Sequence, residues 1–149
     1  NVLSFMNAAT DALLFTQTFT VLAEAAGLGT CFLGTTVYMP QMIIDTLHLP
    51  QLVMPVATLT VGWPAEKPAQ TDRLPLRSII HNETFDDYTP EKIDDFYAEK
   101  EALEENKEFV RINKVETLAQ VFTDIRYTKK DCEAMSTGFM EALRKQGFI

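Results

Sequence analysis

Two short segments of this chain combine hydrogen-bond donors that could bind a flat, anionic ligand. The first is Phe32-Leu33-Gly34-Thr35, which ends a short apolar run, and its consecutive backbone N–H groups could donate to ring nitrogen or oxygen atoms. Gly34 has no Cβ, so a ring could approach the main chain closely there. The second is Thr71-Asp72-Arg73-Leu74-Pro75, where the Arg73 guanidinium in a proline-stiffened loop could fork onto a phosphate or carboxylate. A plain tight turn and a surface ion pair are the alternative interpretations of these two segments.

Other patterns that carry chemistry are absent from the sequence. It has no Cys-x-x-Cys pair, no His-Glu-x-x-His, no Gly-x-Ser-x-Gly and no Walker-type phosphate loop. His48 and His81 are best interpreted as solvent-facing or structurally hydrogen-bonded, and Cys31 as a small buried hydrophobe. Acidic pairs such as Asp94-Asp95 and Glu104-Glu105 are typical of solvated helix faces, and no calcium loop is present. The sequence therefore predicts no catalytic side chain and no metal ligand.

The charged residues are unevenly distributed and mostly acidic. Residues 1–65 carry three acidic side chains and no lysine or arginine, while residues 66–149 hold all 13 basic and 18 of the 21 acidic side chains. The net charge of −8 without a basic patch argues against nucleic acid and against anionic membrane surfaces as partners. Two cysteines, Cys31 and Cys132, make no disulfide framework, and no basic segment precedes the first apolar run. A reducing compartment, the cytoplasm, is the expected location.

Two uncharged stretches have the length of a membrane span. They are Ala25–Ile44 and Thr46–Ala65. Each is interrupted by prolines, and the first also by glycines, so neither can be a continuous helix in lipid. They are expected to belong to a buried core.

The periodicity and punctuation of the chain predict its elements. An almost wholly apolar helix is expected from about Ser4 to Ala26, ended by Gly27 and buried on nearly every side. Thr89 and Pro90 form a helix start, and Gly147 is expected to end the last helix. The remaining expected elements are strands at 30–33 and 53–61 and helices at 40–47, 90–105, 114–125 and 129–146.

These elements do not make a complete core by themselves. Two strands are a marginal sheet with open edges, and an all-round apolar helix needs packing partners on every side. The later helices are amphipathic, so each covers only one face. We therefore expect an incomplete domain that is completed by further sequence and by dimerisation.

The residues that could do chemistry also carry a family resemblance. The run from Asp11 to Gly34 resembles the central helix and flavin-edge turn of the nitroreductase family, the FMN-dependent NAD(P)H oxidoreductases. The resemblance covers residues 1–88, as the C-terminal part of the domain, and residues 89–149 are similar to the helical extension of the larger, oxygen-insensitive branch. It continues in family order through Leu49-Pro50, Val61-Gly62-Trp63-Pro64-Ala65-Glu66, Arg73-Leu74-Pro75-Leu76 and Ile79-Ile80-His81-Asn82-Glu83.

The resemblance implies an α+β fold, a central mixed sheet flanked by helices, in a homodimer with FMN at the interface. It implies that residues 32–35 face the N5 and O4 region of the flavin and that Arg73 binds the phosphate. Thr71 stands where many relatives have a basic residue, so one phosphate contact is expected to be weakened or replaced. The helical extension is expected to pack on the core or on the dimer partner.

The implied reaction is a ping-pong transfer of hydride from NAD(P)H to the flavin and then to a nitroaromatic, a quinone or free flavin. The family's N-terminal Arg/Ser cluster that grips the FMN phosphate does not occur in these residues, so this chain alone is expected to hold FMN poorly. A non-catalytic flavin-binding or dimerisation module on the same scaffold is the alternative. A relative with a specialised substrate, such as a dehalogenase or an azoline dehydrogenase, is a further one.

Overall fold

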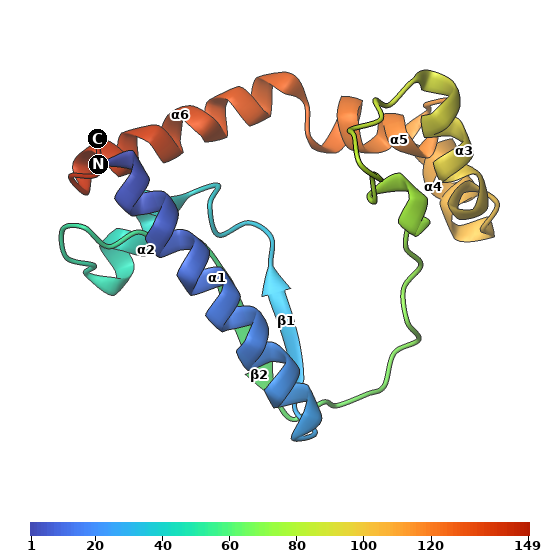
Figure 1. Ribbon diagram of the computed structural model, residues 1–149. Helices are drawn as coiled ribbons and strands as arrows, with labels where there is room; N and C mark the ends of the chain where they lie inside the picture. Colours follow the sequence, from blue (N-terminus) through green and yellow to red (C-terminus); the bar gives the residue numbers. More distant parts are fainter. The chain divides into compact units, whose positions relative to one another are not determined.

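The chain is described by a computed structural model that covers all 149 residues, and it divides into two units (Figure 1). The first unit comprises residues 1–67 and 130–149, and the second comprises residues 68–129. The predicted boundary at residue 88 came from the family resemblance, differs from this division by contacts, and stays a prediction. The two units are described one at a time.

The predicted apolar helix forms and ends where expected. α1 spans Val2–Ala25. Gly27 follows it in the left-handed region, with φ 84°. Its N–H donates to the carbonyl of Glu24, and the Leu28 N–H donates to the carbonyl of Ala23, both at 3.0 Å. This pair of bonds is a Schellman ending, which glycine adopts without steric cost.

The only sheet in the described chain is a two-stranded antiparallel ribbon (Figure 1). β1 (Gly29–Leu33) pairs with β2 (Thr58–Gly62), and Phe32 lies opposite Leu59. α2 (Pro40–Leu47) lies between the strands in sequence and has the predicted bounds. The prediction of a strand from residue 53 was wrong for residues 53–57. Each strand has one partner within the chain, so the outer edges of both are open.

The last helix ends against the first one. α6 spans Lys129–Lys145 and ends through Gly147 at φ 78°. The next residue, Phe148, packs its ring edge-on against Phe5, with 5.3 Å between ring centroids. Phe5, Phe148 and Leu143 form the buried cluster of the first unit.

Residues 50–56 pack on this cluster and do not extend the sheet. The buried amide of Gln146 donates to the carbonyls of Pro50 at 2.8 Å and Val53 at 2.6 Å. Met54 and Val56 pack their side chains against the Phe5 cluster. The backbone that was expected to form the start of the second strand is therefore engaged by the C-terminal segment.

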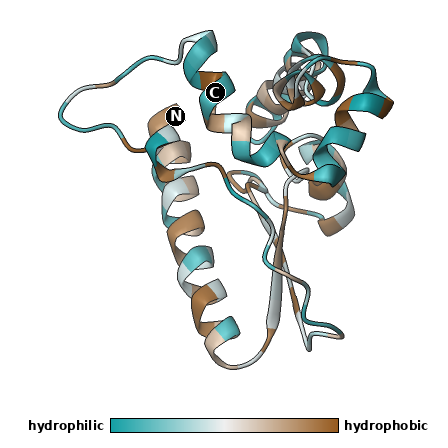
Figure 2. Ribbon diagram, turned by 90° about the vertical axis from the view of Figure 1, so that its right-hand side faces the viewer, coloured by the Kyte–Doolittle hydropathy of each residue, from teal (hydrophilic) through white to brown (hydrophobic).

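Most of the apolar surface of α1 is exposed. Only Phe5, Thr20 and Ala23 of this helix are buried. Phe15 is 73% exposed, and hydrophobic segments recur along the whole helix in Figure 2. This chain by itself therefore does not bury the helix on nearly every side as expected, and the expectation of packing partners from outside the chain stays a prediction. None of the helices, α1 included, has both the length and the apolar character needed to cross a membrane.

The second unit contains short helices whose ends are set by local signals. They are η1 (Leu76–Ser78), α3 (Pro90–Glu101), α4 (Glu104–Asn113), α5 (Leu118–Gln120) and η2 (Val121–Arg126), the last a π-helix. Thr89 caps α3 by accepting from the Lys92 N–H at 3.4 Å, as predicted.

The predicted bounds of the other helices in this unit were wrong. α4 starts at Glu104 because Leu103 is extended, and two acidic residues then occupy its first turn, where the helix dipole favours negative charge. A capping box of Thr117 and Gln120 starts the next helix at Leu118. Leu118 and Val121 are the buried centre of this unit, 1% and 0% exposed.

Candidate functional site

The first predicted ligand-binding segment forms an exposed turn at the end of β1. Phe32 and Leu33 are both 43% exposed, and Gly34 and Thr35 are also exposed. Beneath them, the buried hydroxyl of Thr36 donates to the carbonyl of Leu33 at 3.2 Å and lies 2.9 Å from the hydroxyl of Thr58 on β2. The turn is thus fixed from its inner side while its outer side faces open space.

The chain itself does not require a glycine at position 34. Positive-φ glycines occur at positions 27 and 147, and Gly34 is not among them. A Cβ built on Gly34 would meet no atom within 4 Å. Neither backbone conformation nor packing within the chain explains the residue. The space beside Gly34 is open, so a flat ligand could approach the main chain closely there. The roles assigned to residues 32–35 stay predictions.

Cys31 precedes this turn and is exposed, so the prediction of a buried cysteine was wrong. It was expected to be buried because it lies in an apolar strand, but the chain provides nothing to cover that face of β1. Cys31 lines an open hollow of about 370 Å³ together with Trp63, which is 82% exposed. An exposed tryptophan and an apolar strand edge thus lie at the same place on this surface.

The second predicted segment brings Thr71 and Arg73 into direct contact. Nη1 of Arg73 donates to the hydroxyl of Thr71, to its carbonyl at 3.1 Å, and to the carbonyl of Asp72 at 3.0 Å. These bonds fold the guanidinium back onto its own loop. Nε and Nη2 of Arg73 have no partner within the chain, so these two donors can bind an external anion.

Lys100 reaches this loop from α3. Its ammonium group forms an ion pair with Asp72, with 2.6 Å between Nζ and Oδ2. The hydrogen bond from Lys100 lowers the pKa of the Asp72 carboxyl below its ordinary value, despite some opposing desolvation. Sequence reasoning missed Lys100, because a lysine near the end of a charged helix carries no local sign that it faces a loop far back in the sequence.

Arg73 and Lys100 line one groove of about 680 Å³ in the second unit. Its other walls are mostly apolar or aromatic: Leu74, Leu76, Ile79, Tyr97 and Phe122. The groove thus combines two cations and one carboxylate with an apolar surface. This arrangement suits a ligand with a flat or apolar part and an anionic group.

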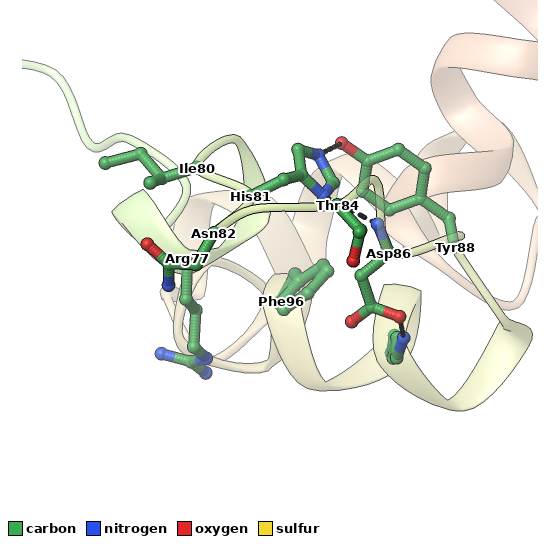
Figure 3. A pocket seen from close by; sticks show the side chains of 9 residues that line it. Arg77, Ile80, His81, Asn82, Thr84, Asp86, Tyr88 and Phe96 are labelled. Carbon is green, nitrogen blue, oxygen red and sulfur yellow. Dashed lines mark hydrogen bonds and ion pairs between the residues drawn. The ribbon is translucent and has the colours of Figure 1, made fainter.

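A smaller pocket of about 250 Å³ surrounds His81 (Figure 3). The backbone N–H of Asp86 donates to Nδ1 of His81 at 3.1 Å, so the hydrogen of the neutral ring lies on Nε2. Nε2 faces the hydroxyl of Tyr88 at 3.4 Å (Figure 3). That hydroxyl donates to the carbonyl of Ser78 at 2.9 Å. The interpretation of His81 as a structurally hydrogen-bonded histidine is therefore confirmed.

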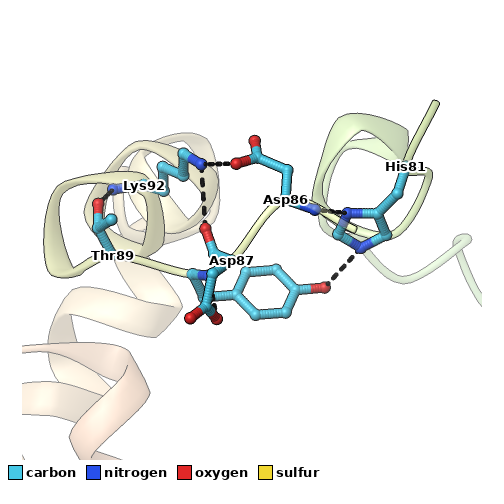
Figure 4. Close-up of polar contacts among 6 residues, drawn as sticks. His81, Asp86, Asp87, Thr89 and Lys92 are labelled. Carbon is cyan, nitrogen blue, oxygen red and sulfur yellow. Dashed lines mark hydrogen bonds and ion pairs between the residues drawn. The ribbon is translucent and has the colours of Figure 1, made fainter. Parts of the chain in front are cut away.

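The cations beside this pocket are already paired. Lys92 forms an ion pair with Asp86 and donates to the carbonyl of Asp87 at 3.0 Å (Figure 4). The Lys92 hydrogen bond lowers the pKa of Asp86 below its ordinary value. Arg77 pairs with Asp95 at 3.0 Å. These ion pairs and hydrogen bonds connect the loop around His81 to α3. The chain contains no group of three or more His, Cys, Asp or Glu side chains that could hold a metal ion.

Three comparisons with known proteins bear on this arrangement. The crystal structure of a candidate oxidoreductase from Bacteroides fragilis NCTC 9343 matches with 62% identity and a TM-score of 0.94, over 100% of this chain and 61% of that protein. The NfrA1 nitroreductase of B. subtilis matches in fold, with a TM-score of 0.76 at 24% identity, over 99% of this chain and 58% of that one. The NAD(P)H FMN reductase of Bacillus subtilis (strain 168) is 39% identical over 82 residues, which are 55% of this chain and 33% of that protein.

These matches show the fold of the chain and the proteins to which it is similar. The fold is part of the nitroreductase fold, of class α+β. In sequence and in fold, the chain is similar to members of the nitroreductase family, as the resemblance predicted. It spans about a third of the length of the first curated relatives that it matches, and this partial coverage fits the expected C-terminal portion of the domain. No protein-family model matches the chain.

Proposed function

We propose that this protein is an FMN-dependent oxidoreductase that uses NAD(P)H to reduce nitroaromatic, quinone or flavin acceptors. The observation that carries the proposal is the exposed turn at residues 32–35, where Gly34 leaves the main chain open to a flat ligand. The relatives support it, because one curated relative is named an FMN reductase and another an oxygen-insensitive NADPH nitroreductase. When bound, FMN would accept hydride from NAD(P)H and supply electrons to the acceptor.

The residues present fit such a cofactor in two separate ways. The turn offers backbone N–H groups beside a glycine, which suits the polar edge of an isoalloxazine ring and favours a reduced, negatively charged ring. The loop offers the unpartnered Nε and Nη2 donors of Arg73, which suit a phosphate. No side chain of the chain needs to act as nucleophile or base, because the redox chemistry belongs to the cofactor.

We further propose that the protein is a homodimer of the cytoplasm. The exposed apolar side chains of α1 and the open edge of β1 support an assembly that covers them. Cys31 and Cys132 are both thiols, which suits a reducing compartment. Light scattering of the purified protein at several concentrations tests the first statement, and a monomer at all of them would contradict it.

The cofactor role of the turn is tested with Gly34→Val. A side chain there would occupy the space left open for the ring, so we expect the Kd for FMN to rise at least about tenfold, which corresponds to about 1.4 kcal/mol. Quenching of FMN fluorescence on titration measures it. Gly62→Val is the matched control, because Gly62 also has open space around it and lies in a strand, where valine is favoured.

Two outcomes would contradict the proposal. Full-length wild-type protein that binds no FMN would contradict the assigned cofactor. If the visible absorbance of the bound flavin does not fall when NAD(P)H is added, the flavin is not reduced. That result would contradict the proposed enzymatic activity and favour the non-catalytic flavin-binding module.

A further inference from the structure

We propose that Lys100 is a second cation for the ligand's anionic group, and that it forms with Arg73 an anion subsite at one end of the groove in the second unit. The inference rests on the proposed function, because it takes FMN as the ligand and its phosphate as the anion. It assigns a role to a residue of α3 that neither the sequence patterns nor the family resemblance singled out.

The first support is that the two cations share one groove. Arg73 comes from the loop and Lys100 from the helix, and both line the same hollow of about 680 Å³. The rest of the wall is largely apolar, with the rings of Tyr97 and Phe122 among its residues. An anionic group at this end of the groove would meet both cations, whereas a purely apolar ligand would leave them unused.

The second support is donor capacity. Lys100 is half-buried, with 21% of its side chain exposed, so it is held in place while still reaching solvent. Its ammonium group has three donor hydrogens, and one direction is used by Asp72. Arg73 keeps Nε and Nη2 available. Together the two side chains offer several donors to phosphate oxygens, which are the acceptors that bind such donors most strongly.

The third support is the part that Asp72 plays between them. Its carboxylate holds Lys100 against the loop, with 2.6 Å between the charged atoms. The carboxylate is ionised at neutral pH, and the hydrogen bond from Lys100 that lowers its pKa further also keeps the lysine in position. The same negative charge opposes an incoming anion. One carboxylate and two cations leave a net positive group, in a chain whose net charge is −8.

The position of Lys100 also bears on Thr71, which stands where many relatives have a basic residue. The resemblance predicted a weakened or replaced phosphate contact at that position, and Thr71 accepts a hydrogen bond from Arg73. A cation supplied by Lys100 from a different element would replace the one that the loop does not provide. The hydroxyl of Thr71 then serves to position the guanidinium.

The test compares FMN with riboflavin, which has the same ring and no phosphate. In the full-length protein, Lys100→Met is expected to raise the Kd for FMN about tenfold, since a charge-assisted hydrogen bond of this kind contributes at least about 1.4 kcal/mol. The Kd for riboflavin should not change.

Matched variants separate charge from folding. Lys100→Arg should retain FMN affinity within about threefold, because it keeps the charge. Lys107→Met should leave it unchanged, because Lys107 pairs with Glu104 on the surface of α4 and lies outside the groove. Thermal unfolding followed by circular dichroism identifies any variant that fails to fold.

Each unfavourable result has a distinct meaning. Equal loss of FMN and riboflavin affinity in folded Lys100→Met would overturn the inference, because Lys100 would then act on the structure and not on the phosphate. FMN binding at the wild-type level in that variant would overturn it too and leave the proposed function standing. No FMN binding by the wild-type protein would overturn the proposed function itself, and the inference with it.

Discussion

The two units differ in how their surfaces are satisfied. The first unit exposes large apolar side chains along α1, with Leu14 64% and Phe15 73% exposed, and its sheet has two open edges. The second unit is fixed by caps and ion pairs, such as the Thr117 capping box and the Arg77–Asp95 pair. In the first unit the exposed apolar side chains follow one continuous helix, whereas in the second unit they are scattered over loops and short helices, as with Leu76 and Phe85, both 68% exposed. We therefore expect the proposed dimer to cover α1.

The largest expected effect concerns the buried ring of Phe5. Phe5→Ala should lower the free energy of unfolding by about 3–5 kcal/mol, because it removes a ring packed on Phe148 and Phe139 and leaves a cavity. Phe15→Ala on the same helix is the control, and in the 149-residue chain it should change stability by less than about 1 kcal/mol. Urea denaturation measures both.

The same pair sharpens the contrast between the units. If α1 is covered when the protein assembles, Phe15→Ala should become clearly destabilising in the full-length protein and should weaken its assembly. A Phe15→Ala effect that stays small in both forms would show that this face remains open, and the proposed difference between the units would then be lost.

A smaller effect is expected at the glycines of the first unit. Gly27→Ala should cost about 1–2 kcal/mol, because a Cβ is unfavourable at φ 84°. Gly34→Ala should leave the stability within about 0.5 kcal/mol, since it has neither a positive φ nor a near neighbour. Thermal unfolding of the two variants measures the difference, and comparable losses would mean that position 34 is structural after all.

The smallest effect concerns acid sensitivity in the second unit. The pKa values of Asp72 and Asp86 are lowered by Lys100 and Lys92, so these carboxylates bind protons less readily in the folded state than in the unfolded state. Their contribution is present above the unfolded pKa, near 3.8, and is lost as the pH falls through the still lower folded values.

We therefore expect stability to decrease with falling pH below about 4, and to do so less steeply in the double variant Asp72→Asn, Asp86→Asn. Denaturation midpoints between about pH 2 and 7 measure this. Glu99→Gln, which removes an exposed carboxylate in the second half of α3, serves as the control. A double variant with the same acid profile as the wild type would show that these pairs add nothing to the second unit.

Elements defined by local signals could be predicted from the sequence. Gly27 ends α1 because only a residue without a Cβ closes the helix readily in the left-handed conformation. Pro40 starts α2 and Thr89 caps α3, and in both cases the signal lies within one turn of the helix end. The lack of packing partners for α1 was also evident, because its apolar residues exceed what two strands can cover.

Features that depend on distant contacts could not be predicted. Residues 53–57 have the composition of a strand, yet the Gln146 side chain donates to the carbonyl of Val53, and Met54 packs against the Phe5 cluster. The neighbours of Cys31 in the sequence are apolar, which predicts burial, but no other part of the chain covers its side chain.

The sequence by itself therefore predicted the similarity to the nitroreductase family, the ends of the main helix and two candidate flavin-binding segments, because all of these depend on residues close together in the chain. The tertiary structure alone decided that Lys100 joins the loop of Arg73 through Asp72, 28 positions earlier in the chain. Attraction between opposite charges acts through space and does not depend on spacing along the sequence. The contribution of Lys100 to the candidate phosphate site could therefore be proposed only from the folded chain.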